Sequence, residues 1–233
     1  MDMRFMNLRI NTLFKKKGNK KMKITIDSAN VKIENGRVTI DVDPAKINEF
    51  LNIGKVELST LKPGDEFKLG NEVFIVLEHT DDGTKVISKD FAYSDVKFGD
   101  CNDWKKSDVR TNLLGQEYYK KIGDIVGKNN IIPMERDLTS LDGLDDYGSC
   151  TDVVSLLTAA EYAKYHKILG LKSNYPDWWW LITPASPPSN DYSRRVCYVN
   201  SRGILGWYGC VCCLGVRPFL TLKSSIFVLE NKD

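Results

Sequence analysis

Hydrophobic and polar residues alternate in short runs along much of this chain, a pattern that is typical of antiparallel β-strands. The clearest runs are residues 66–69, 73–77 and 84–88, and two turn sequences, Gly70-Asn71 and Asp82-Gly83, separate them. Similar runs predict later strands at residues 178–182, 196–199, 204–208, 216–222 and 226–229. The pattern therefore predicts an antiparallel meander followed by a second group of strands.

Two segments instead repeat hydrophobic residues at helical spacing. The first follows Ser107, which suits a helix N-cap. The second begins at Thr158, where Glu161 completes a capping box, and it stops at Gly170. Residues 127–151 lie between the two segments and are expected to be irregular. Two helices packed on short antiparallel strands predict an α+β fold for residues 56–233.

The residues before this domain divide into two parts. Residues 22–55 predict a small module, with a hairpin turn at Asn35-Gly36 and a short helix opened by Asp43-Pro44. Residues 1–21 form a basic leader that we expect to be disordered; an upstream start before Met22 and a basic amphipathic membrane anchor are the alternatives. The leader has no signal-peptide core, and no apolar run approaches the ~20 residues that a membrane span needs. We therefore expect a protein without an integral membrane segment that is cytoplasmic when made.

The composition limits the classes of partner. The 233 residues are 42% hydrophobic and carry a net charge of +2. This is enough hydrophobic material for one large core, so we expect a soluble globular protein. A charge so close to zero gives no long-range attraction for polyanions, and nucleic acid is not expected as a partner. An oligomer is compatible with this composition.

The segment from Ala185 to Cys213 differs from the rest of the chain. It contains no Lys, Glu, Gln or Met, yet it holds three arginines and four of the six cysteines. It is bracketed by residues 177–184, with three consecutive tryptophans, and by residues 215–220. Each tryptophan needs apolar side chains to pack against and a hydrogen-bond acceptor for its indole N–H. An arginine in an apolar strand needs buried hydrogen-bond acceptors for its guanidinium. The residues interpreted as a structural framework around a displayed binding surface are Trp178, Trp179, Trp180 and Arg217.

The candidate chemical sites have plainer explanations. His79 and His166 are the only histidines, and neither accompanies a nucleophile motif, so no catalytic residue is assigned. The cysteines raise a zinc site as an alternative, but they lack the paired C-x2-C spacing, and no metal is assigned. Clustered aspartates leave calcium as the one alternative cofactor, although the usual bidentate Glu is missing. The cysteines concerned are Cys197, Cys210, Cys212 and Cys213, and the aspartates are Asp137, Asp142, Asp145 and Asp146.

A family resemblance is carried by five segments: Asp103–Leu113, Val154–Tyr162, Trp178–Pro184, Val199–Leu205 and Gly215–Lys223. In this order they resemble an uncharacterised family of bacterial and phage domains, and the likeness extends over about residues 56–229. The last three of these segments, from Trp178 to Lys223, also resemble the C-type-lectin-like fold. That fold is shared by the variable proteins diversified by retroelements and by relatives of the formylglycine-generating enzyme.

The resemblance implies a C-type-lectin-like α+β domain whose ligand-binding face lies between the tryptophan-rich strand and the final glycine–arginine strand. Retroelement diversification replaces adenines and gives NNY codons, which cannot encode Lys, Glu, Gln, Met or Trp. From Ala185 to Cys213 only Trp207 lies outside the set that such codons encode. A Lys-poor, partly buried strand segment is the alternative explanation of this composition.

These patterns together predict a non-enzymatic recognition protein, phage-encoded or bacterial, that binds a protein or a glycan. Tyrosine and arginine suit such a surface because they offer large contacts at low entropic cost and fixed hydrogen-bond donors. Two alternatives stay open: a formylglycine-generating type of cysteine oxidase, and a structural component of a phage or prophage particle. The expected ligand-binding residues are Tyr192, Arg194, Arg195, Tyr198, Trp207, Tyr208, Cys210 and Cys212.

Overall fold

The computed structural model describes residue 52 and residues 54–169, 178–190 and 193–231, together with four strand segments nearer the N-terminus. The chain divides into two compact units, Met1–Gly54 and Lys55–Asp233. In the first unit β1 (Arg9–Ile10) pairs with β2 (Ile24–Thr25), and β3 (Asn30–Glu34) pairs with β4 (Arg37–Asp41). Glu34 lies opposite Arg37, so the two flanking strands pair as predicted, while the turn expected at Asn35-Gly36 lies outside the described residues. The helix expected at Asp43-Pro44 lies outside the described residues.

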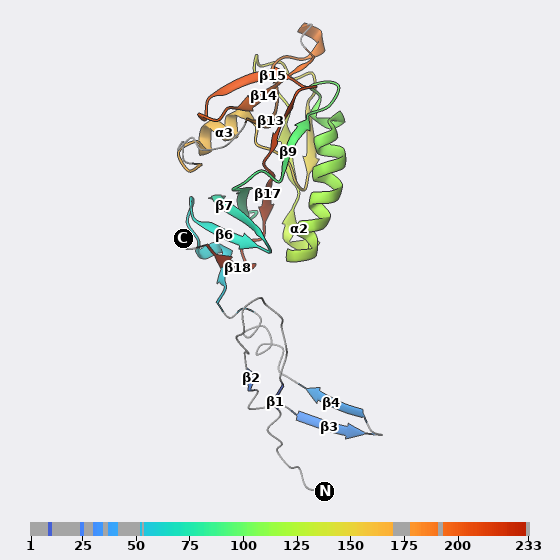
Figure 1. Ribbon diagram of the computed structural model, residues 1–233, viewed down its shortest axis with the longest axis vertical. Coiled ribbons are helices and arrows are strands. Elements are labelled where there is room, and N and C mark those ends of the chain that lie inside the picture. The colour runs from blue at the N-terminus through green and yellow to red at the C-terminus, as the bar shows by residue number, and fades with distance from the viewer. Residues whose placement is uncertain are drawn as a thin grey trace. The chain divides into compact units, whose positions relative to one another are not determined.

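The second unit contains a seven-stranded antiparallel sheet that curls into a half-barrel (Figure 1). Its strands follow the order β10-β17-β8-β7-β6-β18-β5. The predicted meander forms its centre, because Leu69 pairs with Glu72 and His79 pairs with Thr84 across the two turns. Its strands are β5 (Val56–Glu57), β6 (Glu66–Leu69), β7 (Glu72–His79), β8 (Thr84–Ser88), β10 (Ile131–Ile132), β17 (Phe219–Leu222) and β18 (Phe227–Glu230).

A second sheet has five strands in the order β15-β14-β13-β16-β9. All of its pairings are antiparallel except that of β13 with β16, where Trp179 lies opposite Gly215. A separate pair joins β11 (Met134–Asp137) to β12 (Ser149–Asp152). The five strands are β9 (Tyr93–Lys97), β13 (Trp179–Pro184), β14 (Arg195–Val199), β15 (Leu205–Gly209) and β16 (Cys213–Val216).

Two longer helices accompany the sheets. The first is a π-helix, η3 (Val109–Tyr118), that continues as α2 (Tyr119–Val126) along one side of the unit (Figure 1). The second is α3 (Ala159–Tyr165), which lies against β13 and carries the predicted capping box between Thr158 and Glu161. Four short 3-10 turns complete the described elements: η1 (Leu58–Thr60), η2 (Trp104–Lys106), η4 (Lys128–Asn130) and η5 (Pro188–Asn190).

The hydrophobic core consists of two clusters, one on each face of the five-stranded sheet. Alternate residues of β13 enter different clusters, as the two-residue period of a strand requires. Trp180 packs with Phe98 and Trp104 in the larger cluster. Trp179 packs with Tyr162 of α3 in the smaller one. Every residue of β13 is buried, so the tryptophan-rich strand lies in the interior.

The Gly-Val-Arg-Pro motif lies where the chain passes from one sheet to the other. The sequence predicted one strand over residues 216–222, but β16 ends at Val216 and β17 begins at Phe219 in the other sheet. The chain also crosses between the sheets from β8 to β9, and Ser88 N–H donates to the Pro218 carbonyl at 2.9 Å. The proline has no N–H for a ladder, so the strand is interrupted there.

The α+β, C-type-lectin-like fold expected from the sequence is wrong. Strands account for 37% of the structure and helices for 22%, and the half-barrel sheet rather than helices on strands organises the unit. The additional strands come from regions without a clear pattern. Residues 127–151 were expected to be irregular but contribute β10, β11 and part of β12, and β9 was not predicted. Strands of two to five residues are too short to give a periodic signal.

Candidate functional site

The hairpin formed by β14 and β15 contains four of the eight predicted ligand-binding residues, Arg195, Tyr198, Trp207 and Tyr208. Its register pairs Val196 with Tyr208 and Cys197 with Trp207, without a bulge. Because paired residues share a face of a sheet, the hairpin directs its side chains to two sides. Cys197 and Trp207 are on the side of α3, which we call the α3 face, and Val196 and Tyr208 are on the opposite face. The predicted residues therefore do not form one continuous surface.

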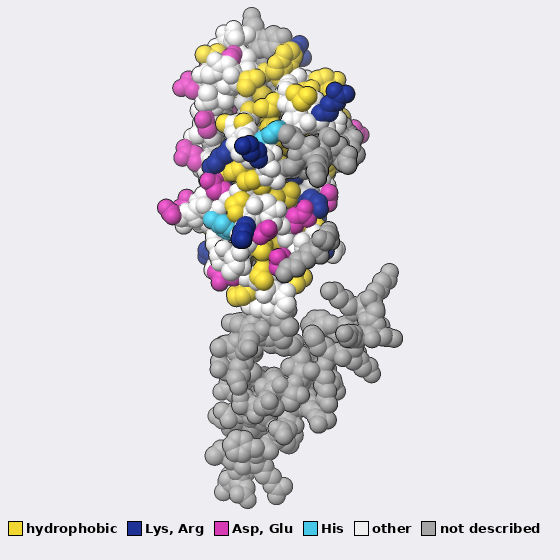
Figure 2. Space-filling model, turned by 90° about the vertical axis from the view of Figure 1, so that its left-hand side faces the viewer, with side chains coloured by type: hydrophobic (Ala, Val, Ile, Leu, Met, Phe, Trp, Pro, Cys, Tyr) yellow, Lys and Arg dark blue, Asp and Glu magenta, His cyan; other side chains and the backbone are white. Residues whose placement is uncertain are grey.

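On the α3 face the structure brings Arg195 and Trp207 together. The Arg195 guanidinium lies 4.3 Å from the centre of the Trp207 ring, a cation–π contact. Trp207 is 47% exposed and Leu205, two residues before it on β15, is 40% exposed. In the upper part of Figure 2, hydrophobic and basic side chains lie next to each other on the surface. This face thus offers solvent an aromatic ring, an aliphatic side chain and a fixed positive charge.

The opposite face carries a cluster of three aromatic rings. Trp178 stacks on Tyr198 with ring centres 4.7 Å apart, and Tyr208 meets both rings edge-on. Tyr208 is 43% exposed, whereas Trp178 and Tyr198 are half-buried. Trp178 was interpreted as framework only, but its ring borders this partly exposed cluster. Trp179 and Trp180, by contrast, are buried.

The absence of a side chain at Gly206 leaves room for the Tyr198 ring. A Cβ atom at position 206 would lie 2.8 Å from the Tyr198 ring, which is shorter than van der Waals contact allows. We expect Gly206→Ala to push Tyr198 off Trp178 and to lower the free energy of unfolding by about 1–2 kcal/mol, as overpacking does. Chemical denaturation measures this change. Gly209→Ala is the matched control, since its Cβ meets nothing closer than 3.5 Å; equal losses in the two variants would contradict the expectation.

The two buried cysteines of this region, Cys197 and Cys210, do not have the properties of reactive thiols. Burial raises the pKa of Cys197 to about 12 and also raises that of Cys210, opposite to the shift of a reactive thiol. Cys210 is fully buried, so its side chain cannot contact a ligand as predicted. Cys212 is half-buried and Cys213 is exposed. Within residues 54–169, 178–190 and 193–231, His, Cys, Asp and Glu nowhere gather in a group of three or more that would hold a metal.

The remaining predicted residues are less informative. Arg194 is exposed, and its carbonyl accepts a hydrogen bond from Cys210 N–H at 2.9 Å. Tyr192 lies outside the described residues. Of the aspartates considered for calcium, Asp142 is engaged by the hydroxyls of Ser140 and Ser186, which hold the pKa of its carboxyl below the usual value. These bonds tie residues 140–142 to the end of β13 and give the loop a structural explanation.

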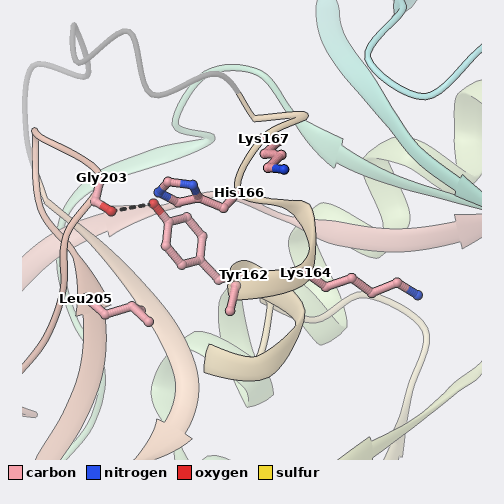
Figure 3. A pocket seen from close by; sticks show the side chains of 7 residues that line it. Tyr162, Lys164, His166, Lys167, Gly203 and Leu205 are labelled. Atoms are coloured by element: carbon pink, nitrogen blue, oxygen red, sulfur yellow. Dashed lines mark hydrogen bonds between the residues drawn. The ribbon is translucent and has the colours of Figure 1, made fainter.

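Sequence reasoning missed an open pocket of about 530 Å³ between α3 and the hairpin (Figure 3). The Tyr162 hydroxyl donates to the Gly203 carbonyl at 2.7 Å, and the His166 ring lies against Tyr162. Leu205 lines the pocket from β15, so the pocket adjoins the α3 face of the hairpin. A backbone carbonyl in a turn gives no sequence signal, which is why the pairing of these two segments was not expected.

The geometry defines a two-sheet β domain that presents an exposed hairpin, and sequence comparison places it in a family. Residues 82–224, more than half of the 233 residues, match the family described as Domain of unknown function (DUF6273), and the chain belongs to this family. The matched range includes the hairpin and the passages from β8 to β9 and from β16 to β17. No curated protein and no solved structure matches the chain.

Over the part of the chain that the structure describes, no helix is both long and apolar enough to cross a bilayer.

Proposed function

We propose that this protein is a non-enzymatic recognition protein that binds a partner protein through its β14–β15 hairpin. The observation that carries the proposal is the half-buried Arg195 held over exposed Trp207, beside exposed Leu205 on the outer strand β15. Tryptophan, tyrosine and arginine are the residues that contribute most binding energy in protein interfaces. We call Arg195, Leu205 and Trp207, which share the α3 face, the hairpin surface.

Its aliphatic content favours a protein over a glycan as the partner. Ile204 is 56% exposed and Val211, just beyond β15, is 50% exposed. With Leu205 and Trp207 on the α3 face and Tyr208 on the opposite face, these side chains leave large apolar groups in water along β15 and at both of its ends. Sugars are recognised through aromatic rings and polar groups, whereas aliphatic side chains match the apolar centre of a protein interface.

The alternatives from the sequence gain no support. A cysteine oxidase needs thiols that ionise readily, and burial raises the pKa of Cys197 to about 12. A role as a passive component of a particle does not account for an arginine fixed over an exposed tryptophan. The recognition role rests on side chains that are presented to solvent and held in a defined geometry.

Trp207→Ala tests the proposal. The wild-type protein captures the partner from a lysate of the source organism, and the purified partner is then titrated by calorimetry. We expect the variant to bind at least about thirtyfold more weakly, since a central interface tryptophan contributes about 2 kcal/mol or more.

Phe227→Ala is the matched control. Phe227 is a 46% exposed aromatic residue on β18 of the other sheet, and its loss should leave the affinity unchanged. Equal affinities for wild-type protein and the Trp207 variant would reject the proposed surface. Trp207-dependent binding to a glycan array, without a protein partner, would show that the class of ligand is wrong.

A further inference from the structure

The strand β15 forms an edge of the five-stranded sheet. The hydrogen bonds at the two ends of the hairpin show which residues of β15 bond to β14 and which direct their backbone groups outward. Asn200 N–H donates to the Ile204 carbonyl, and Cys210 N–H donates to the Arg194 carbonyl. In an antiparallel pair every second residue bonds to the neighbouring strand. Gly206 and Tyr208 therefore bond to β14, while Leu205 and Trp207 direct their N–H and C=O groups away from it.

The other three edges of the two large sheets have features that prevent pairing with another chain. The outer strands of the half-barrel, β5 and β10, are only two residues long. The other edge of the five-stranded sheet, β9, contains Lys97, a register irregularity and Asp95 with a φ of 59°. Short strands, charges and irregularities are the usual ways in which proteins protect their edges.

Strand β15 lacks these features. Its sequence is Leu-Gly-Trp-Tyr-Gly, with no charged residue and no proline, and all five residues pair regularly with β14. Leu205 and Trp207 are both exposed at the positions whose backbone groups face outward. An unprotected edge with exposed large side chains is the arrangement that accepts an added strand from another polypeptide.

The charges around β15 indicate which polypeptide fits. From Ser193 to Cys213 the chain has three arginines and no acidic residue. Arg202 lies in the turn before β15, and Arg194 and Arg195 lie opposite its end. A second copy of this strand would bring like charges together, whereas an acidic segment would meet complementary charge at both ends.

We infer that β15 accepts an extended acidic segment of the partner protein as a sixth strand of this sheet. The inference rests on the proposed function and specifies how the partner binds. Backbone hydrogen bonds from Leu205 and Trp207 supply the strand pairing, and the Arg195–Trp207 pair contacts alternate side chains of the segment on the α3 face.

The test uses a displayed library of random heptapeptides selected on the full chain. We expect selected peptides to be enriched in Asp and Glu. Leu205→Pro removes one outward N–H without removing a bond to β14, and it should weaken peptide binding about tenfold beyond the effect of Leu205→Ala. Leu205→Ala is the matched control because it shortens the same side chain but keeps the N–H. Fluorescence anisotropy measures both affinities.

Amide hydrogen exchange of the wild-type protein gives a second readout that needs no variant to fold. A bound peptide should slow exchange at Leu205 and Trp207 by about tenfold or more, with smaller changes at Gly206 and Tyr208, which already bond to β14. No protection at Leu205 and Trp207, no acidic enrichment, or equal affinities of the Pro and Ala variants would each overturn the inference. Protection of the same amides by self-association, detected by sedimentation without peptide, would also overturn it.

The failure of this inference can be separated from failure of the proposed function. If Trp207→Ala abolishes binding of the natural partner while Leu205→Pro does not, the hairpin recognises its partner through side chains alone. If neither variant changes partner binding, the proposed function fails as well.

Discussion

Replacing Arg217 with alanine is expected to lower the free energy of unfolding by about 3–5 kcal/mol, a large part of the stability of an ordinary domain. Arg217 is fully buried at the passage between the two sheets. Its Nε donates to the Ser88 carbonyl at 3.0 Å, and its guanidinium lies 4.9 Å from the centre of the Trp179 ring. The side chain therefore connects the end of β8, the tryptophan-rich strand and the β16–β17 passage.

The cost of the substitution has two physical sources. The Ser88 carbonyl loses its charged donor in a buried place, and buried acceptors without a partner are costly. The missing side chain also leaves a cavity under Trp179, which close-packed neighbours fill only in part. Chemical denaturation followed by tryptophan fluorescence measures the sum of both effects.

Arg202→Ala is the control for Arg217→Ala. Arg202 is an exposed arginine in the turn before β15, and its loss should change stability by less than about 0.5 kcal/mol. Similar stabilities of the two variants would show that Arg217 does not connect the sheets energetically.

The parts of the fold that could be predicted from sequence are those with local signals. The turn at Gly70-Asn71 and the capping box at Thr158 each involve residues within a few positions, and both are present. The break after Val216 depends on contacts with Ser88, which is remote in sequence. Local patterns could not show that residues on either side of Arg217 belong to different sheets.

The sequence predicted which segment contains the candidate site, but it did not predict how the residues of that segment are arranged on the surface. The sequence identified Arg195 and Trp207 as separate candidates, and only the hairpin register places one over the other. The register also separates Tyr198 and Tyr208 from that pair, because a strand alternates its side chains. Two hydrogen bonds at the ends of the hairpin determine which residues of β15 direct their backbone N–H and C=O groups outward. No residue type predicts these bonds, so the proposed addition of a strand to β15 could not be inferred from sequence.

Burial explains part of the unusual composition of Ala185–Cys213. Val196, Cys197, Val199 and Cys210 are all buried, and long charged side chains such as Lys and Glu are seldom found in such places. The exposed positions of the segment, among them Arg194 and Tyr208, are where sequence diversification would alter binding without disturbing the core.

The ion pair between Arg136 and Glu161 should produce a pH-dependent stability. Burial by itself would raise the pKa of Glu161, but hydrogen bonds and charge from Arg136, with hydrogen bonds at Thr158, outweigh it and hold the pKa below its ordinary value of 4.5. Arg136 Nη1 donates to Glu161 Oε1 at 2.9 Å, and Thr158 N–H donates to Oε2 at 2.8 Å. The carboxylate thereby joins β11 to the start of α3.

The sign of the effect follows from the direction of the pKa shift. A carboxyl group whose pKa is lowered by folding contributes its full stability above its unfolded value, here 4.5, and loses it as the pH falls through the lower folded value. Glu161→Gln keeps the shape of the side chain but leaves the buried Arg136 charge without its counter-charge. We expect this variant to lose about 3–5 kcal/mol at pH 7.

Denaturation curves between pH 7 and about pH 3 check this prediction. The difference in stability between wild-type protein and Glu161→Gln should be largest at pH 7 and should shrink below pH 4.5 as the wild-type carboxylate becomes protonated. Glu135→Gln is the control, because Glu135 is an exposed neighbour of Arg136 on β11 and should give a small difference at every pH. A difference for Glu161→Gln that stays constant over this range would mean that packing, rather than the charge of the carboxylate, stabilises the junction of β11 and α3.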